Sequence, residues 1–226
     1  MDFYVDSSDL EAIKSVAEYY PINGFTTNPN ILTQSTRTIT EVLKELRDYS
    51  KSENLKIFIQ VTSQTAEDMY LQSKHCRSFF GNNLIVKIPA VKEGYKAIRM
   101  CHEAGIPVLC TVVHSMTQAL MAAKAGAEYV APYISHIDNI GADGVAAVRD
   151  MITVFRESGY HCKVLGASFR NVDQIKRLAL VGCQAVTLPP LFFDMLIKHP
   201  STNESMKGFN DVWKANFGER EIDDFL

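Results

Sequence analysis

One pattern recurs along the chain and limits what it can fold into: an amphipathic stretch, a glycine, and a short run of apolar, β-prone residues. Glycine adopts the left-handed conformation just beyond a helix at little cost, so each instance predicts a helix that ends and leads into a strand. The glycines that fit the pattern are Gly24, Gly105, Gly126, Gly159 and Gly182. Three residue pairs with capping-box spacing predict helix starts: Ser8 with Glu11, Thr38 with Glu41, and Asn171 with Gln174.

The same pattern predicts eight strands, each separated from the next by a helix. They are expected at residues 3–6, 24–28, 56–61, 84–89, 107–113, 129–135, 163–168 and 185–189. Several of these runs are apolar throughout, which is typical of parallel strands that are covered on both faces. Eight β/α units in 226 residues predict a compact (β/α)8 TIM barrel of the α/β class, and the count of eight disfavours a doubly wound open sheet.

Apolar residues continue at helical spacing beyond the eighth strand. They are Met206, Phe209, Val212, Trp213 and Phe217. This spacing predicts an additional C-terminal helix at residues 201–218, within a single barrel domain that spans residues 1–226. Such a helix either caps the barrel or packs on a neighbouring subunit of a homo-oligomer, and its spacing favours neither arrangement.

Composition excludes several classes of partner. A net charge of -3 and an isoelectric point near 6.1 provide no basic field for nucleic acid or for an anionic membrane surface. No uncharged apolar stretch reaches the roughly 18 residues of a membrane span, and the acidic start MDFYVDSSDL is unlike a secretory signal. Five scattered cysteines without a C-x-x-C pair indicate reduced thiols, so we expect a cytoplasmic protein.

Polar residues gather where the predicted strands end, which is where the active site of such a barrel lies. In chain order they are Asp6, Thr26, Asn28, Gln60, Lys87, Thr111, Tyr133, His136, Ser168 and Arg170. Any single hydroxyl at these positions is explained by solvation of the barrel rim. The convergence of several strands on one lysine is not explained in this way and predicts a catalytic site.

Lys87 is the most informative of these residues, because it interrupts the apolar strand NLIVKIPA. Alternation places it on the same face as Ile85 and Pro89. Burial of an ammonium group is costly and lowers its pKa toward neutrality, and a neutral amine is what imine formation with a ketone or aldehyde requires. The alternative is a buried ion pair between Lys87 and Asp6. Lys56 and Lys163, by contrast, begin their strands and belong at the opposite end of the barrel.

The neighbours of Lys87 suggest roles in proton transfer and binding. Asp6 is the only carboxylate at a strand end, suited to easing proton transfer or to holding a substrate hydroxyl. Tyr133, Gln60 and Thr111 are placed to share a water molecule, and among them only Tyr133 has a titratable proton. Ser168 and Arg170 follow the seventh strand, where helix amides, a hydroxyl and a guanidinium would make a phosphate clamp; a surface arginine is the alternative.

Other chemistries lack support in the sequence. The six histidines form no H-E-x-x-H motif and no cluster with metal-ligand spacing. Neither G-x-G-x-x-G, a P-loop nor G-x-S-x-G occurs. We therefore expect an activity that needs no metal and no nucleotide cofactor.

Seven segments, spread in order over essentially the whole chain, resemble the small transaldolase family, and within it the fructose-6-phosphate aldolase subgroup. They are FYVDSSD, GFTTNPNIL, IFIQV, LIVKIP, AGAEYVAPYISHID, VLGASFRN and AVTLP. The resemblance implies a (β/α)8 barrel with a Schiff-base lysine on the fourth strand, which falls on Lys87. It also implies a decamer of two pentameric rings in which the C-terminal helix reaches a neighbouring subunit.

The resemblance also assigns roles to the remaining residues. Asp6 and Asn28 would contact the hydroxyls of a bound dihydroxyacetone unit, and Thr26 would line the same pocket. Three residues would hold the catalytic water: Gln60, Thr111 and Tyr133. Ser168 and Arg170 would bind the phosphate of the acceptor.

Three positions bear on which member of the family this chain resembles. True transaldolases of the family usually have Glu at position 60 and Phe at position 133, so Gln60 and Tyr133 match the aldolase pattern. His136 stands where the family usually has Arg, which implies weaker, pH-dependent phosphate binding or an acceptor that lacks phosphate. Asn30 replaces the usual Ser, a minor change at a helix start.

These observations predict a class I aldolase, an aldehyde-lyase that cleaves or forms fructose 6-phosphate from dihydroxyacetone and glyceraldehyde 3-phosphate. A transaldolase of the pentose phosphate pathway is the alternative enzyme, since it holds the same three-carbon unit until an aldose accepts it. From a different class, a barrel that binds sugar phosphates without turnover is the third interpretation.

Overall fold

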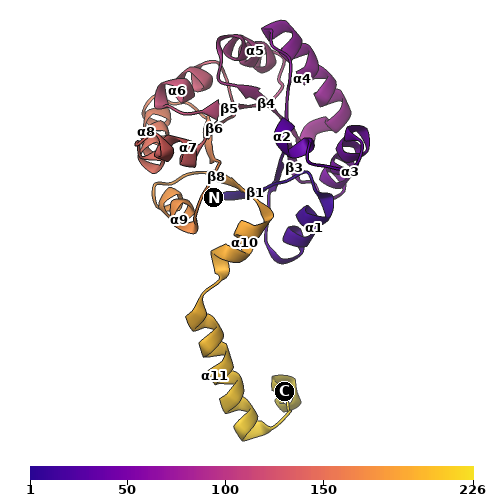
Figure 1. Ribbon diagram of the computed structural model, residues 1–226, viewed down its shortest axis with the longest axis vertical. Helices are drawn as coiled ribbons and strands as arrows, with labels where there is room; N and C mark the ends of the chain where they lie inside the picture. Colours follow the sequence, from indigo (N-terminus) through magenta and orange to yellow (C-terminus); the bar gives the residue numbers. More distant parts are fainter. The chain divides into compact units, whose positions relative to one another are not determined.

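Eight parallel strands close into a barrel in the computed structural model, which describes residues 1–226. Each strand pairs with the next along the chain, and β8 pairs with β1, while most of the helices that connect consecutive strands lie outside the barrel (Figure 1). The strands are β1 (Asp2–Asp6), β2 (Gly24–Thr26), β3 (Lys56–Gln60), β4 (Leu84–Pro89), β5 (Val108–Val113), β6 (Tyr129–Pro132), β7 (Lys163–Gly166) and β8 (Ala185–Leu188). The predicted (β/α)8 barrel is confirmed.

The helices alternate with the strands as predicted. They are α1 (Leu10–Tyr19), α2 (Pro29–Leu32), α3 (Ile39–Ser52), α4 (Ala66–Phe80), α5 (Lys92–Glu103), α6 (Met116–Lys124), α7 (Ile134–Asn139), α8 (Gly144–Glu157), α9 (Val172–Leu180), α10 (Pro190–Ile197) and α11 (Pro200–Phe217), with short 3-10 turns at Gly81–Asn83 (η1) and Ile222–Phe225 (η2). Thr38 with Glu41 and Asn171 with Gln174 form the expected capping boxes. The prediction at Ser8 is wrong by one residue, because the Asp9 carboxylate caps α1.

Apolar and aromatic side chains fill the inside of the barrel. Residues from seven of the eight strands form one buried cluster of Tyr4, Phe58, Ile85, Leu109, Tyr129, Ala131, Leu165 and Ala185. The Tyr4 and Phe58 rings lie 4.9 Å apart and the Phe58 and Tyr129 rings 5.8 Å apart, both edge to face. Side chains therefore fill the barrel interior beneath Lys87 and leave no pore through it, as is usual for the fold.

Lysines close the amino-terminal end of the barrel. Lys56 is the first residue of β3, and its ammonium donates a hydrogen bond of 2.8 Å to the Tyr129 hydroxyl. Lys163 is the first residue of β7 and lies over the Tyr129 ring. The prediction that these two lysines lie at the structural end of the barrel, away from Lys87, is confirmed.

Gly24 serves a different purpose from the other glycines of the repeated pattern. Gly105, Gly126, Gly159 and Gly182 have the positive φ expected beyond a helix end. Gly24 instead begins β2, with a φ of 151°, and a β-carbon placed on it would lie 2.0 Å from the Lys56 carbonyl oxygen. Only glycine therefore allows β2 and β3 to approach so closely.

The chain divides into two compact units, Met1–Phe193 and Asp194–Leu226. The first contains the barrel. The second contains α11, whose bounds agree with the helix expected at 201–218, and the η2 turn. Within it the Trp213 ring packs against Phe217 and Phe225, and its indole N–H donates to the Arg220 carbonyl at 2.7 Å.

No helix combines the length and the apolar character needed to cross a membrane. All five cysteines are free thiols, and four of them are buried.

Candidate active site

Lys87 lies inside the barrel, near the carboxyl end of β4. It is only 6% exposed, and in register it has Gln60 of β3 on one side and Leu109 of β5 on the other. Its ammonium donates a hydrogen bond of 2.6 Å to the backbone carbonyl of Thr27. Lys87 is thus the one charged residue of β4, and its neighbours along the strand are apolar and buried.

Burial sets the protonation of this amine. Loss of hydration lowers the pKa of Lys87 to about 8, and the nearby Asp6 charge opposes that shift in part. The alternative expected from the sequence, a direct ion pair with Asp6, does not form: the ion pairs of the structure all join other side chains. Lys87 is therefore close enough to neutrality to act as a nucleophile.

Asp6 is the last residue of β1, and Thr26, the last residue of β2, holds its carboxylate. The Thr26 hydroxyl donates to Asp6 Oδ1 at 2.7 Å and lies 2.6 Å from the Thr187 hydroxyl of β8. Burial raises the pKa of Asp6, whereas Lys87 and the Thr26 hydrogen bond lower it in part. A carboxyl group whose pKa is raised is a candidate for proton transfer.

Thr111 and Tyr133 place two hydroxyls in the same space, 3.3 Å apart. Thr111 comes from β5, and Tyr133 precedes α7, where its N–H donates to the Val113 carbonyl at 3.0 Å. Burial raises the pKa of the Tyr133 phenol; Thr111 opposes this and the Asp6 charge adds to it. Tyr133 is therefore a proton donor at neutral pH.

The backbone between these two residues is strained. Val112 has a φ of 60°, in the left-handed region that β-branched residues avoid, and the β5–β6 register shifts between Cys110 and Val113. A bulge of this kind redirects the side chains beside it, and here the neighbour is the buried Thr111.

Eight of the ten predicted site residues line one cavity of about 310 Å³. They are Asp6, Thr26, Asn28, Lys87, Thr111, Tyr133, His136 and Ser168. The cavity therefore brings polar side chains from the ends of several strands together around Lys87. Asn30 and Thr187 complete the polar part of the lining.

Gln60 and Arg170 do not line this cavity. Gln60 lies beside Lys87 in register, yet it lines a separate cavity of about 290 Å³ together with Thr62 and Pro89. The structure therefore does not bring Gln60 to the Thr111–Tyr133 pair, as the shared water required. Arg170 is exposed in the loop after β7, and only its backbone N–H makes a hydrogen bond, to Gln174.

Two further residues, His114 and Thr187, stand at strand positions that the two-residue period and the strand ends could have indicated. His114 is the first residue after β5, and its ring stacks on His136 at 5.6 Å and meets Tyr133 edge to face at 5.5 Å. Thr187 alternates with the barrel-interior residue Ala185 along β8, so the two-residue period indicates that it faces inward.

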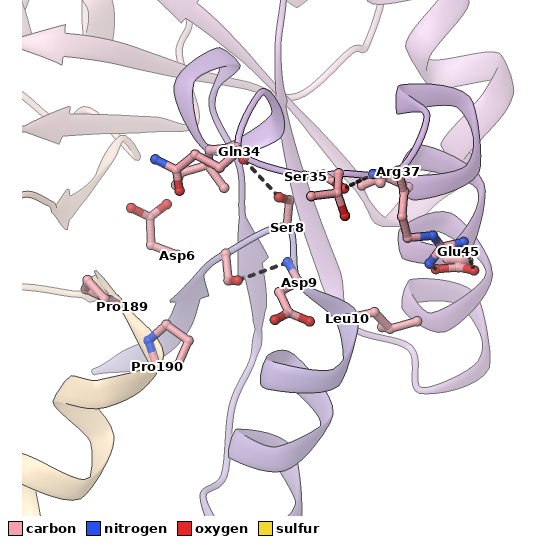
Figure 2. Close-up of a pocket in the computed structure, with 14 residues that line it drawn as sticks. Asp6, Ser8, Asp9, Leu10, Gln34, Ser35, Arg37, Glu45, Pro189 and Pro190 are labelled. Carbon is pink, nitrogen blue, oxygen red and sulfur yellow. Dashed lines mark hydrogen bonds and ion pairs between the residues drawn. The ribbon is translucent and has the colours of Figure 1, made fainter.

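Asp6 also lines a second cavity, of about 610 Å³, formed by the loops after β1 and α2 and by the start of α10 (Figure 2). At one side of the view Arg37 pairs with Glu45 through two hydrogen bonds of 2.5 and 2.6 Å, and Asp6 lies at the other. Asp9 is a further carboxylate of this lining. The cavity thus has an acidic character with its one guanidinium already paired.

No group of three or more His, Cys, Asp or Glu side chains is arranged to hold a metal ion. The 310 Å³ cavity around Lys87 contains an amine, a carboxyl group with a raised pKa, and a phenol. These groups suit reversible addition of an amine to a carbonyl carbon, followed by proton transfers on the adduct.

Solved structures with similar folds are distant in sequence. Thiamine phosphate pyrophosphorylase from Pyrococcus furiosus superposes with a TM-score of 0.59 at 14% identity, covering 83% of this chain and 85% of that one. A structure described as native KDPGal gives 0.59 at 13% identity, covering 82% and 80%. At this identity the similarity concerns the barrel fold alone.

Relatives in sequence are much closer. A probable transaldolase of Lactiplantibacillus plantarum is 34% identical over 215 residues, which cover 95% of this chain and 97% of that protein. A probable transaldolase of Caulobacter sp. strain K31 is 36% identical over 213 residues, covering 94% and 96%. The family model described as transaldolase/fructose-6-phosphate aldolase matches residues 3–224. The chain therefore belongs to the transaldolase/fructose-6-phosphate aldolase family.

Proposed function

We propose that the protein is a class I aldolase that cleaves fructose 6-phosphate to dihydroxyacetone and glyceraldehyde 3-phosphate, and catalyses the reverse addition. The observation that carries this proposal is the buried Lys87, whose pKa is about 8, in a cavity shared with Asp6 and Tyr133. The family supplies the aldol chemistry, and Tyr133 and Gln60 favour the aldolase within it.

The chemistry follows from these groups. Neutral Lys87 attacks C2 of the ketose, and loss of water from the carbinolamine gives an iminium ion. The iminium accepts the electrons of the C3–C4 bond while the C4 hydroxyl loses its proton, so that the aldehyde leaves and an enamine remains. Protonation of the enamine carbon and hydrolysis of the imine then release dihydroxyacetone and restore the amine.

Three residues surround the reacting atoms. The Tyr133 phenol, beside Thr111, is placed to donate a proton to the enamine carbon and to orient a water molecule that accepts the C4 proton. Asp6 is placed to transfer protons during formation and hydrolysis of the imine, with Thr26 orienting its carboxylate. Asn28 lines the same cavity and offers an amide to a substrate hydroxyl.

Reduction with borohydride in the presence of dihydroxyacetone tests the imine. We expect one reduced three-carbon adduct, located on Lys87 by peptide mass analysis, and no adduct or cleavage with Lys87→Met. Lys163→Met is the matched control, since Lys163 begins β7 at the far end of the barrel. An adduct on another lysine, or turnover retained by Lys87→Met, contradicts the mechanism.

A transaldolase is the second candidate, and the names of the two relatives favour it. The two activities differ in whether water or a second aldose discharges the enamine. Release of glyceraldehyde 3-phosphate from fructose 6-phosphate without an acceptor identifies an aldolase. Release only after erythrose 4-phosphate is added identifies a transaldolase.

We further propose that the protein is a cytoplasmic homo-oligomer. Its five free thiols are consistent with a reducing compartment, and α11 exposes Met206, Phe209 and Val212. The Phe209 side chain is 70% exposed, which is unfavourable unless another surface covers it. Light scattering should give a mass of several subunits, and Phe209→Glu should reduce it; a monomeric wild-type protein contradicts the proposal.

A further inference from the structure

We infer that Thr27 is a positioning residue for the nucleophile: its backbone carbonyl holds the reacting nitrogen of Lys87, and its side chain holds that carbonyl in place. This inference rests on the proposed imine chemistry and adds a residue to it. Thr27 follows β2 and does not line the cavity of Lys87, so it acts on the reaction through the lysine and not through the substrate.

The contact is made by the first carbonyl beyond β2, a strand that ends at Thr26. Lys87 Nζ, which comes from β4, donates a hydrogen bond of 2.6 Å to the Thr27 oxygen. Thr27 is fully buried and Lys87 is nearly so, which keeps water from competing for this bond. The bond therefore fixes the direction of one N–H of the amine and restricts the directions left to its lone pair.

The Thr27 carbonyl is itself held on both sides. The N–H and the hydroxyl of Thr27 both donate to the Phe58 carbonyl of β3, each at 3.0 Å. On the other side of the peptide group, the Asn28 side chain caps α2 by accepting from the Ile31 N–H at 2.9 Å. Of these anchors, the Thr27 hydroxyl is the one that a substitution at this residue can remove.

The partner that holds the nitrogen is uncharged, which suits an amine that must become neutral before it reacts. Asp6 acts on the charge of Lys87, yet it forms no ion pair with the lysine, and its carboxylate accepts from Thr26 instead. A carboxylate in the place of the Thr27 oxygen would bind the ammonium form more strongly than a carbonyl does. The carbonyl thus orients the nitrogen without fixing it as a cation.

The same acceptor suits the iminium ion. The neutral amine has two N–H bonds, and one of these protons passes to the C2 oxygen as the lone pair of nitrogen bonds to C2. That oxygen takes a second proton, from Asp6, and leaves as water while the nitrogen forms the C=N double bond. The iminium nitrogen keeps one N–H and a positive charge, so its bond to the Thr27 carbonyl becomes charge-assisted and stronger. The carbonyl therefore favours the iminium over the free ketone and amine.

Substitution of the Thr27 hydroxyl tests this role. Thr27→Val has nearly the shape of threonine, and we expect the apparent dissociation constant for dihydroxyacetone, measured from the extent of borohydride trapping, to rise at least fivefold. Thr27→Ala removes the same hydroxyl without a branched side chain and should show the same rise. Thr27→Ser keeps the hydroxyl and should stay within twofold of the wild-type protein.

Ser50→Ala is the matched control for loss of a buried hydroxyl. The Ser50 hydroxyl donates to the Leu55 carbonyl at 2.6 Å, near the end of α3, and has no contact with Lys87. Trapping in this variant should match that of the wild-type protein. A rise as large as that of Thr27→Val would assign the effect to general loosening of the barrel and overturn the inference.

An analogue that cannot react separates positioning of the lysine from damage to the cavity. Glucitol 6-phosphate has no carbonyl group, so it binds without forming an imine, and its inhibition constant should be unchanged in Thr27→Val. An equal rise in both constants, or unchanged trapping in Thr27→Val, overturns this inference and leaves the aldol mechanism intact. Absence of an adduct on Lys87 in the wild-type protein overturns the proposed function, and this inference with it.

Discussion

The hydroxyl of Tyr133 lies 3.3 Å from that of Thr111, although the two residues belong to different β/α units. The Tyr133 backbone is fixed on both sides, because its N–H donates to the Val113 carbonyl and it bridges to Ala167. The phenol is thus presented to the cavity from a backbone that is tied to β5 and β7. Both the position of the Tyr133 phenol and its protonation can therefore be tested by substitution.

Replacing Tyr133 by Phe should keep the ring packing and remove the proton. We expect cleavage to fall by roughly ten- to a hundred-fold, since general acid–base catalysis is lost. Trapping of dihydroxyacetone by borohydride should persist, because imine formation uses Lys87 and Asp6. Cleavage at the wild-type rate would remove Tyr133 from proton transfer.

Substitution of Val112 tests whether the strained bulge positions Thr111. Val112→Gly accommodates a φ of 60° but frees the segment, so we expect kcat to fall severalfold with little change in KM, and stability to change by less than about 1 kcal/mol. Val112→Asn is the matched control, because asparagine tolerates the left-handed region while restricting the backbone more than glycine does. Equal kcat in all three proteins would show that the bulge has no positioning role.

The buried amine should also affect the dependence of stability on pH. Since the pKa of Lys87 is lowered to about 8, the unfolded chain binds more protons than the folded one between pH 8 and the ordinary lysine value. The free energy of unfolding should therefore rise with pH in this window. Relative to Lys87→Met, the wild-type protein should gain about 2 kcal/mol between pH 8 and pH 10.

Urea unfolding of both proteins at the two pH values measures this difference, and groups common to both cancel. Lys163→Met, which removes an exposed lysine, should show no such gain relative to the wild-type protein. A difference between Lys87→Met and wild type that stays constant from pH 8 to pH 10 would mean that Lys87 titrates like a solvated amine.

Two glycine substitutions should distinguish a glycine required by close contact between strands from one required by its positive φ. In Gly24→Ala the new β-carbon would lie 2.0 Å from the Lys56 carbonyl oxygen, so we expect a loss of more than about 3 kcal/mol or failure to fold. In Gly105→Ala the φ of 68° is unfavourable but the space is open, so we expect a loss of about 1 kcal/mol. Thermal unfolding of both variants provides the comparison, and equal losses would contradict this account.

Much of the barrel could be predicted because local signals repeat with every β/α unit. The apolar runs located each strand to within a few residues, and the charge of Lys87 inside one such run located the buried amine. The predicted strand bounds were wrong where contacts between distant parts of the chain determine the local structure. Strand β6 ends at Pro132 and α7 begins at Ile134, because the N–H groups of Ile134 and Ser135 donate to carbonyls in the loop after β7.

The parts of the site that could not be predicted depend on side chains meeting across the barrel. The position of Gln60 beside Lys87 in register gave no indication that it lines a separate cavity. The spacing of Ser168 and Arg170 suggested a phosphate clamp, and it did not show that Asn171 and Gln174 pair three of the backbone N–H groups there. Sequence shows which donors exist, and only coordinates show which are already paired.

The aromatic packing of Tyr4, Phe58 and Tyr129 has a kinetic consequence. With the barrel filled beneath Lys87, substrate and products share a single route, through the strand ends where His136 and Ser168 lie. In cleavage, the aldehyde leaves first, because the three-carbon unit is bound deeper in the barrel on Lys87 and is released after it. In the direction of synthesis the ketone must enter first, and an aldehyde that arrives early blocks the lysine. For the proposed Lys87 imine, the filled floor of the barrel therefore predicts an ordered sequence, with inhibition by excess aldehyde that is relieved by more ketone.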